Sequence, residues 1–373
     1  VVNRPYQETS SRVSGSEIIS SNSKTSYNGN YGLNASWTIY NGSKRLKTLK
    51  QERLNNQVAE LDVATSENTI KESIAQIYIQ ILYAAESVRV NENTLQVSIA
   101  QRDRGQELLN AGSIAKSDFA QLEAQVSTDR YQLVTAQATL QDYKLQLKQL
   151  LELDGENEMN VYLPKLSDEN VLAPLPAKKD VYVSALAIRP EIEASKLNVE
   201  ASELGIDIAK SSYFPTISLS AGIGTNHTSG SDFTFGEQVK NGWNNSIGLS
   251  VSVPIFNNRQ TKSAVQKAKL QRETDMLSLL DEQKALYKTI ESLWLDANSA
   301  QQRYAAANEK LRSTQISYDL ISEQFNLGMK NTVELLTEKN NLLQAQQEQL
   351  QAKYMAILNT QLLKFYQGDK LTL

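Results

Sequence analysis

Residues 325–336 read FNLGMKNTVELL, a stretch that predicts the end of one helix, a tight turn and the start of another. Gly328 suits the left-handed residue that commonly ends a helix. Glu334 lies in the first turn of the next helix, where a carboxylate meets the positive end of the dipole. The stretch LNAGSIAKSDFA at residues 109–120 has the same pattern, with Gly112 placed 216 residues before Gly328. The sequence therefore predicts the same helical elbow twice.

The offset of 216 residues fits a second motif. It aligns YGLNASWTIYN at residues 31–41 with IGLSVSVPIFN at residues 247–257, and no gap separates this motif from the elbow in either half. One offset that fits two separate motifs indicates a duplicated unit.

The interval between the two motifs predicts very long helices. Residues 258–327 contain no proline and no glycine, and their apolar residues are spaced alternately by three and four, as in a heptad seam. The first half has a weaker seam, interrupted at Asn91, Ser98 and Arg102. We expect long helices over 43–111 and 258–327, each about 105 Å long at 1.5 Å per residue. Return helices over 115–153 and 331–367 should run antiparallel beside them, because the elbows are short.

Strands are predicted before each long helix. Residues 31–39, 217–223 and 247–255 alternate apolar side chains with Gly, Ser, Thr and Asn. Alternation alone also fits a half-buried sheet on a soluble core. The small polar face and the aromatic residues near the strand ends favour a membrane barrel instead.

These patterns divide the chain into two repeats. The first covers 1–153, with a strand hairpin at 1–41. The second covers 190–373, with a short helix at 190–211 and a strand hairpin at 213–256. An irregular linker, 154–189, separates them. Four strands cannot close a barrel, and an open sheet edge in lipid leaves backbone groups unpaired, so a membrane location requires several copies of the chain.

Composition excludes several classes of function. The 373 residues carry a net charge of −4, which argues against a nucleic-acid surface, and they contain no cysteine. The single histidine, His227, lies in a polar Gly/Ser-rich stretch, and we expect it to be inert. No cluster of acid, base and nucleophile points to an enzyme, and no phosphate-binding loop, metal site or cofactor site is expected. No run of 18 apolar residues predicts a transmembrane helix.

Three motifs together resemble the TolC-like outer-membrane efflux proteins. They are RPEIEASKLNVEASELGIDIAKSSYFPTISLSAGIG at residues 189–224, SVPIFNNRQTKSAVQKAKLQ at residues 252–271 and the elbow LGMKNTVELL. The resemblance implies a mixed, mostly α-helical membrane protein whose long antiparallel helices form an α-barrel. It also implies that each of three protomers adds four strands to one 12-stranded β-barrel. By the 216-residue offset, the counterpart of the helix that starts at Pro190 is expected before Val1.

The resemblance also implies a function and partners. A homotrimer in the outer membrane of a Gram-negative bacterium, with a large periplasmic portion, would form the exit duct of an efflux or type I secretion system. Its elbows would meet a periplasmic adaptor linked to an inner-membrane pump, through Gly112, Ser113, Gly328 and Met329. No nucleic acid is expected as a partner.

Gate residues follow from the same resemblance, position by position. The family closes its periplasmic end with carboxylates after the second elbow, which Glu334 matches. It latches that end with an aromatic residue, a basic residue and an acid, here Phe325, Lys330 and Asp118. Phe325 has no hydroxyl group and Lys330 is a single-point donor, so a weaker latch is expected. Alternatively, Asp118 and Glu334 only favour helix starts.

One other function fits the helical hairpins. A soluble periplasmic adaptor or coiled-coil scaffold also carries such hairpins, although adaptors usually have one, and the duplication argues against this alternative.

Overall fold

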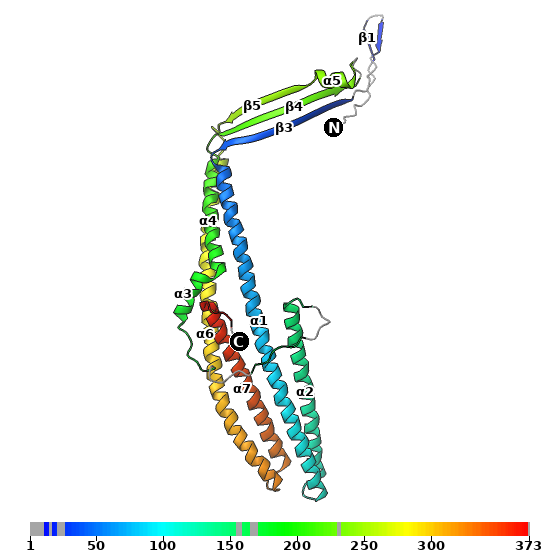
Figure 1. Cartoon of the computed structure of the whole chain (residues 1–373), viewed down its shortest axis with the longest axis vertical. Helices are drawn as coiled ribbons and strands as arrows, with labels where there is room; N and C mark the ends of the chain where they lie inside the picture. Colours follow the sequence, from blue (N-terminus) through cyan, green and yellow to red (C-terminus); the bar gives the residue numbers. More distant parts are fainter. Residues whose placement is uncertain are drawn as a thin grey trace. The chain divides into compact units, whose positions relative to one another are not determined.

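The computed structural model describes residues 11–14, 17–20, 27–153, 159–164, 171–229 and 233–371. This part is mostly helical and belongs to two compact units (Figure 1). One unit combines Val1–Asn56 with Asn198–Met276, and the other combines Gln57–Leu197 with Leu277–Leu373. Each unit therefore contains segments of both sequence repeats.

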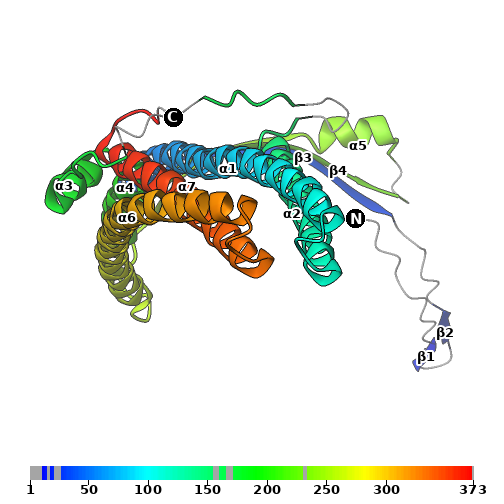
Figure 2. The same ribbon diagram turned by 90° about the horizontal axis from the view of Figure 1, so that it is seen from below.

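Four long helices form two antiparallel hairpins. The first hairpin consists of α1 (Lys44–Asn110) and α2 (Lys116–Leu150), and the second of α6 (Gln260–Asn326) and α7 (Thr332–Gln367). Helices α1 and α6 have 67 residues each, or about 100 Å at 1.5 Å per residue. In the second unit α7 packs against α6, α1 and α2 (Figures 1 and 2).

The backbone repeats itself where a strand gives way to a long helix. Gly42 and Ser43 have φ angles of 67° and 63° before α1, and Asn258 and Arg259 have φ angles of 51° and 63° before α6. Left-handed backbone is rare outside glycine, so the same pair of left-handed residues at the 216-residue offset is a structural sign of duplication.

The main sheet is antiparallel, in the order β3 (Asn28–Asn41), β4 (Thr216–Thr228), β5 (Asn244–Ser252). Two short strands, β1 (Ser11–Ser14) and β2 (Glu17–Ser20), pair with each other.

This pairing joins the two halves of the sequence. The described partner of β3, from the first half, is β4, from the second half, while the strand hairpin expected at 1–41 stays a prediction. Matching apolar alternation explains the register, since Leu33 lies opposite Ile223 and Trp37 opposite Leu219. The rest of the first 26 residues lies outside the described part.

The segment 154–189 was expected to be an irregular linker. Part of it is instead a helix, α3 (Lys178–Ile188). Two side chains one turn apart, Val181 and Ala185, are fully buried in a cluster that includes Leu363 and Tyr366 of α7. Burial of this face stabilises a helix that is too short to show a clear period in the sequence. Helix α4 (Pro190–Ser211) follows directly.

A short helix also lies in the segment between β4 and β5. It is α5 (Phe235–Asn241), and its start is a capping box. The backbone N–H of Thr234 donates to Glu237 Oε2 at 2.8 Å, and the backbone N–H of Glu237 donates to Thr234 Oγ1 at 3.4 Å.

Candidate functional site

The two elbows have the same hydrogen-bonded geometry. Ser113 N donates to Leu108 O at 2.8 Å, and Met329 N donates to Gln324 O at 2.8 Å. Gly112 and Gly328 have φ angles of 75° and 73°. This is the Schellman arrangement, in which a left-handed glycine lets the last carbonyl groups of a helix find donors.

The glycines and their neighbours are accessible. A Cβ added at either glycine meets no atom within 4 Å. Leu327 and Met329, which flank the second glycine, are 70% and 71% exposed. Ser113 is also exposed at the first elbow. The four residues expected to meet an adaptor therefore lie at two open chain reversals.

Lys330 and Glu334 contact each other after the second elbow. Lys330 Nζ lies 2.6 Å from Glu334 Oε1, and Asn331 N donates to Glu334 Oε2 at 3.2 Å. The ammonium group of Lys330, and then the backbone N–H of Asn331, hold the pKa of Glu334 below its usual range. Asn331 Oδ1 accepts from Glu334 N at 2.9 Å, so Glu334 also completes a capping box that starts α7.

Asp118 caps the helix after the first elbow. Its Oδ2 accepts from Ala115 N at 3.4 Å. The described residues show no ion pair between Asp118 and Lys330, whose partner is Glu334. The helix-start interpretation of both carboxylates therefore has direct geometric support, while Asp118 and Lys330 are not brought together within one chain.

Phe325 lies in an apolar cluster behind the second elbow. It is 2% exposed and packs with Leu122 of α2 and Leu335 of α7. Leu108 of α1 also borders this cluster. Phe325 therefore helps to join the two hairpins, which accounts for an aromatic residue that has no hydroxyl group.

A buried ionic cluster, which sequence reasoning missed, also connects the hairpins. It consists of Ser98 of α1, Asp129 of α2 and Lys339 of α7, and we call it the Lys339 cluster. Lys339 Nζ donates to both partners, Ser98 Oγ donates to Asp129 Oδ2, and Gln125 Nε2 donates to Asp129 Oδ1 at 2.9 Å.

Burial distinguishes this cluster from the other charges near the elbows. Ser98, Asp129 and Lys339 are 2%, 1% and 3% exposed. Burial lowers the pKa of Lys339, against the opposing effect of Asp129. The sequence signal was present, because each residue interrupts an apolar seam, as Asp129 does between Val126 and Leu133.

A second buried charge lies beside α3. Arg189 Nε donates to Glu191 Oε1 at 2.7 Å, and both terminal nitrogens of Arg189 lie 3.3 Å from Glu72 Oε1. Tyr366 Oη lies 3.4 Å from Glu72 Oε2, and the Arg189 guanidinium carbon is 4.2 Å from the centre of the Tyr366 ring. Burial raises the pKa of Tyr366 to about 12. The RPE motif thus ties α4 to α1 and α7.

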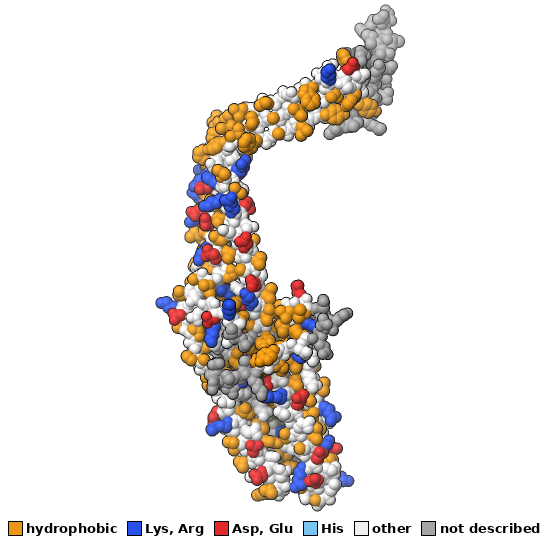
Figure 3. All heavy atoms as spheres, in the orientation of Figure 1, with side chains coloured by type: hydrophobic (Ala, Val, Ile, Leu, Met, Phe, Trp, Pro, Cys, Tyr) orange, Lys and Arg blue, Asp and Glu red, His pale blue; other side chains and the backbone are white. Residues whose placement is uncertain are grey.

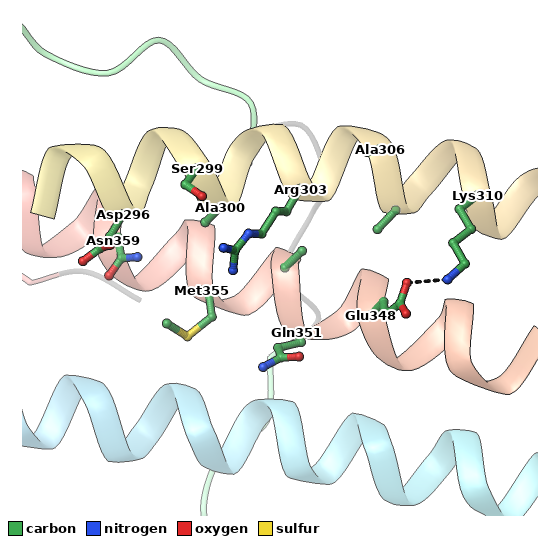
Figure 4. A pocket seen from close by; sticks show the side chains of 12 residues that line it. Asp296, Ser299, Ala300, Arg303, Ala306, Lys310, Glu348, Gln351, Met355 and Asn359 are labelled. Carbon is green, nitrogen blue, oxygen red and sulfur yellow. Dashed lines mark hydrogen bonds and ion pairs between the residues drawn. The ribbon is translucent and has the colours of Figure 1, made fainter. Parts of the chain in front are cut away.

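A groove of about 600 Å³ runs between α6 and α7 (Figure 4). Its lining includes the small side chains of Ala300 and Ala352 and also Arg303 of α6. Lys310 Nζ and Glu348 Oε2 form an exposed ion pair across it at 2.7 Å.

The two faces of the main sheet differ in chemistry. Its strands β3, β4 and β5 contain no charged residue. One face carries Leu33, Trp37, Ile247 and Leu249, which are 73%, 60%, 85% and 66% exposed. The other face carries small polar side chains, such as Ser36 opposite Ser220. Figure 3 shows the sheet with scattered hydrophobic side chains and few charges.

Two negative findings apply to the described residues. None of their helices combines the length and the apolar character that crossing a membrane requires. Their His, Cys, Asp and Glu side chains form no group of three or more that could hold a metal ion.

Comparison with protein families gives one match that covers most of the chain. Residues 5–152 and 181–368 match the family described as "Outer membrane efflux protein".

Known proteins with similar sequences carry names of the same kind. Outer membrane efflux protein BepC of Brucella suis is 26% identical over 294 residues, or 78% of this chain and 61% of BepC. Outer membrane protein TolC of Escherichia coli is 24% identical over 341 residues, or 88% of this chain and 66% of TolC. The chain thus spans between three fifths and two thirds of the length of these relatives.

Solved structures share the fold. A structure of CusC, whose report concerns transmembrane channel formation, superposes with a TM-score of 0.78 at 19% identity and covers 99% of this chain and 83% of CusC. The outer membrane protein VceC of Vibrio cholerae superposes with a TM-score of 0.75 at 16% identity, over 100% of this chain and 86% of VceC.

Proposed function

Because this chain belongs to the outer membrane efflux protein family, we propose that it forms an exit duct in the outer membrane of a Gram-negative bacterium. The duct carries cargo across the periplasm and the outer membrane for an efflux or type I secretion system. Relatives carry names that refer to efflux, to drug and toxin export and to protease secretion. These names support a role in export without identifying the cargo.

The exposed apolar face of the main sheet is the observation that supports a lipid location most directly. Burying a side chain such as Leu249 or Ile247 contributes about 1.5–3 kcal/mol, and in water this contribution is lost. Hydrocarbon can cover this face, while the small polar face suits an aqueous lumen. Both faces are then in the environment that their side chains favour.

The sheet edges require additional copies of the chain. An unpaired edge in lipid costs several kcal/mol for each backbone group, so the strands of one chain need neighbours. A homotrimer, with four strands from each chain in a 12-stranded β-barrel, meets this requirement. The long helices of three chains then form the α-barrel.

The duct is a passive conduit. The sequence contains no phosphate-binding loop, so the energy for transport comes from an inner-membrane pump. An adaptor contacts the exposed elbows at Gly112, Ser113, Gly328 and Met329, and opening is a shift of one helix pair against another. We assign the chain no catalytic role.

The gate includes Glu334 and Asp118 from the helix starts, with Lys330 and Phe325 as supports. A ring of Glu334 carboxylates at the periplasmic end would favour cations. Conductance of Glu334→Ala in planar bilayers tests this role, and unchanged cation selectivity and conductance would leave Glu334 only its capping role.

Reconstitution tests the duct itself. We expect the detergent-purified protein to form discrete ion-conducting channels in planar lipid bilayers. The alternative, a soluble periplasmic adaptor or scaffold, predicts protein that leaves the membrane fraction without detergent and forms no channel.

A further inference from the structure

The Lys339 cluster connects the two helical hairpins close to their elbows. Lys339 stands eleven residues beyond Gly328, or about 16 Å along a helix at 1.5 Å per residue. Asp129 and Ser98 belong to the other hairpin. Other ion pairs described near the elbows are of a different kind. Lys330–Glu334 and Arg104–Glu107 are local and partly exposed, and Lys310–Glu348 joins two helices of the same hairpin.

Burial makes this connection sensitive to movement. A shift of α7 against α1 and α2 separates Lys339 from Asp129 while both still lie in a protein interior. A buried charge that loses its partner is strongly destabilised unless water reaches it. The arrangement with the charges in contact is therefore favoured, and an arrangement that separates them needs hydration of the cluster or a bound partner.

The apolar contacts nearby do not impose the same restriction. The cluster of Leu122, Phe325 and Leu335 lies between the Lys339 cluster and the elbows. Apolar side chains can slide past one another and keep part of their contact, because dispersion and hydrophobic contacts have no preferred direction. The ionic contact is directional, so it distinguishes the two arrangements more sharply.

We propose that the Lys339 cluster is a latch that joins the two hairpins and sets how readily the periplasmic end of the duct opens. This inference rests on the proposed function. In the closed latch Lys339 contacts Ser98 and Asp129, and this contact breaks when the hairpins separate.

Single-channel recording tests the latch through variants of Lys339. Loss of one partner of a buried ion pair is strongly unfavourable, so we expect Lys339→Met to raise the open fraction at least about tenfold. The double variant Lys339→Met/Asp129→Leu removes both charges and leaves none unpaired, and it should also raise the open fraction. The matched control is Lys310→Met/Glu348→Gln, which removes an exposed ion pair within one hairpin and should leave the open fraction unchanged.

Distance measurement supplies a second readout that does not depend on conductance. The chain has no cysteine, so spin labels at Ser113→Cys and Met329→Cys mark the two elbows alone. In trimers that contain one labelled chain, we expect a longer and broader elbow-to-elbow distance in Lys339→Met than in the parent protein.

The outcomes separate the latch from the duct. The latch would be overturned if the parent protein forms channels and the assembled variants show an unchanged open fraction and an unchanged elbow distance. It would also be overturned if both Lys339 variants fail to assemble, because the cluster would then be purely structural. Parent protein that forms no channel would contradict the proposed function instead, and the elbow distances would then still test whether the cluster holds the hairpins together.

Discussion

Glu334 depends on Lys330 for its low pKa. The ammonium group at 2.6 Å is the largest cause of the shift, followed by the backbone N–H of Asn331. A carboxylate with a depressed pKa stabilises the folded state above its unfolded pKa, and this contribution is lost as the pH falls through the lower folded value. The start of α7 should therefore fray in acid, below the usual range of a glutamate.

Substitution of the lysine separates its effect from that of the helix start. We expect Lys330→Met to raise the pKa of Glu334 toward its usual value, measured by NMR of carboxyl-labelled glutamate with Glu334→Gln for assignment. Glu348 is an internal control, since Lys310 lowers its pKa and this pair is not altered. If Glu334 titrates identically in Lys330→Met, the ion pair does not form in solution.

Tyr366, which lies beside Arg189 and Glu72, should make the stability of the protein depend on pH in the alkaline range. Burial raises its pKa to about 12. An acid with a raised pKa keeps its proton in the folded state while the unfolded state loses it, so stability falls as the pH rises from about 10 to about 12. The loss is on the order of 2–3 kcal/mol, at 1.36 kcal/mol per unit.

Removal of the phenol should abolish this part of the loss. We expect Tyr366→Phe to unfold at more similar denaturant concentrations at pH 9 and pH 11.5 than the parent protein does, and to lack one late-titrating phenol in ultraviolet absorbance. Tyr131→Phe, which removes an exposed phenol, is the comparison. Equal alkaline sensitivity of Tyr366→Phe and the parent would contradict a buried phenol at this site.

At the scale of elements, the elbows combine an unusual backbone with an open surface. A β-branched residue at Gly112 or Gly328 has to adopt the left-handed region, at about 1–2 kcal/mol for each position, whereas asparagine tolerates this region. We expect Gly112→Val/Gly328→Val to abolish transport while trimers persist, measured by export in cells and by native mass spectrometry.

The asparagine pair identifies the cause. Gly112→Asn/Gly328→Asn keeps the turn and adds similar bulk to the same surface. Loss of transport in both double variants indicates close contact with a partner, and loss in the valine variant alone indicates the turn conformation. Normal transport in both would remove the elbows from the proposed contact surface.

The faces of β5 offer a test with neighbouring residues. Leu249 lies on the apolar face, and Ser250 lies on the polar face opposite Ser218. We expect Leu249→Arg to reduce the amount of protein assembled in the outer membrane, because arginine near the bilayer midplane costs about 2–4 kcal/mol. Ser250→Arg should assemble and change conductance. Equal assembly of the two variants would mean that lipid does not cover the apolar face.

Sequence patterns predicted the long helices well because period and duplication act over many residues. The helix expected over 258–327 is observed as Gln260–Asn326, and proline and glycine are absent between its ends. Short elements were missed where tertiary contacts decide: α3 is stabilised by burial of Val181 and Ala185 against α7. The Lys339 cluster was missed for the same reason, because a polar residue in a seam reveals its partner only when the hairpins are placed side by side.

At the scale of the whole molecule, duplication and the sheet argue for the same assembly. In the proposed homotrimer, two similar hairpins in each chain would supply six nearly equivalent helix pairs around a lumen. The described part of the chain leaves the apolar face of the sheet exposed, so in the proposed duct lipid covers this face and neighbouring chains pair the sheet edges. The folded monomer should therefore be less stable than the assembly.

This dependence predicts how the protein behaves during extraction. We expect it to remain in the outer-membrane fraction until detergent is added, and then to sediment as three copies of the 41.6 kDa chain. Dilution in detergent should not dissociate it, because separation of the chains exposes backbone groups at every sheet edge. Membrane washes with high salt and with alkaline carbonate are the control for peripheral binding. A stable, water-soluble monomer would show that the sheet needs neither lipid nor other copies, and the proposal of an exit duct would then fail.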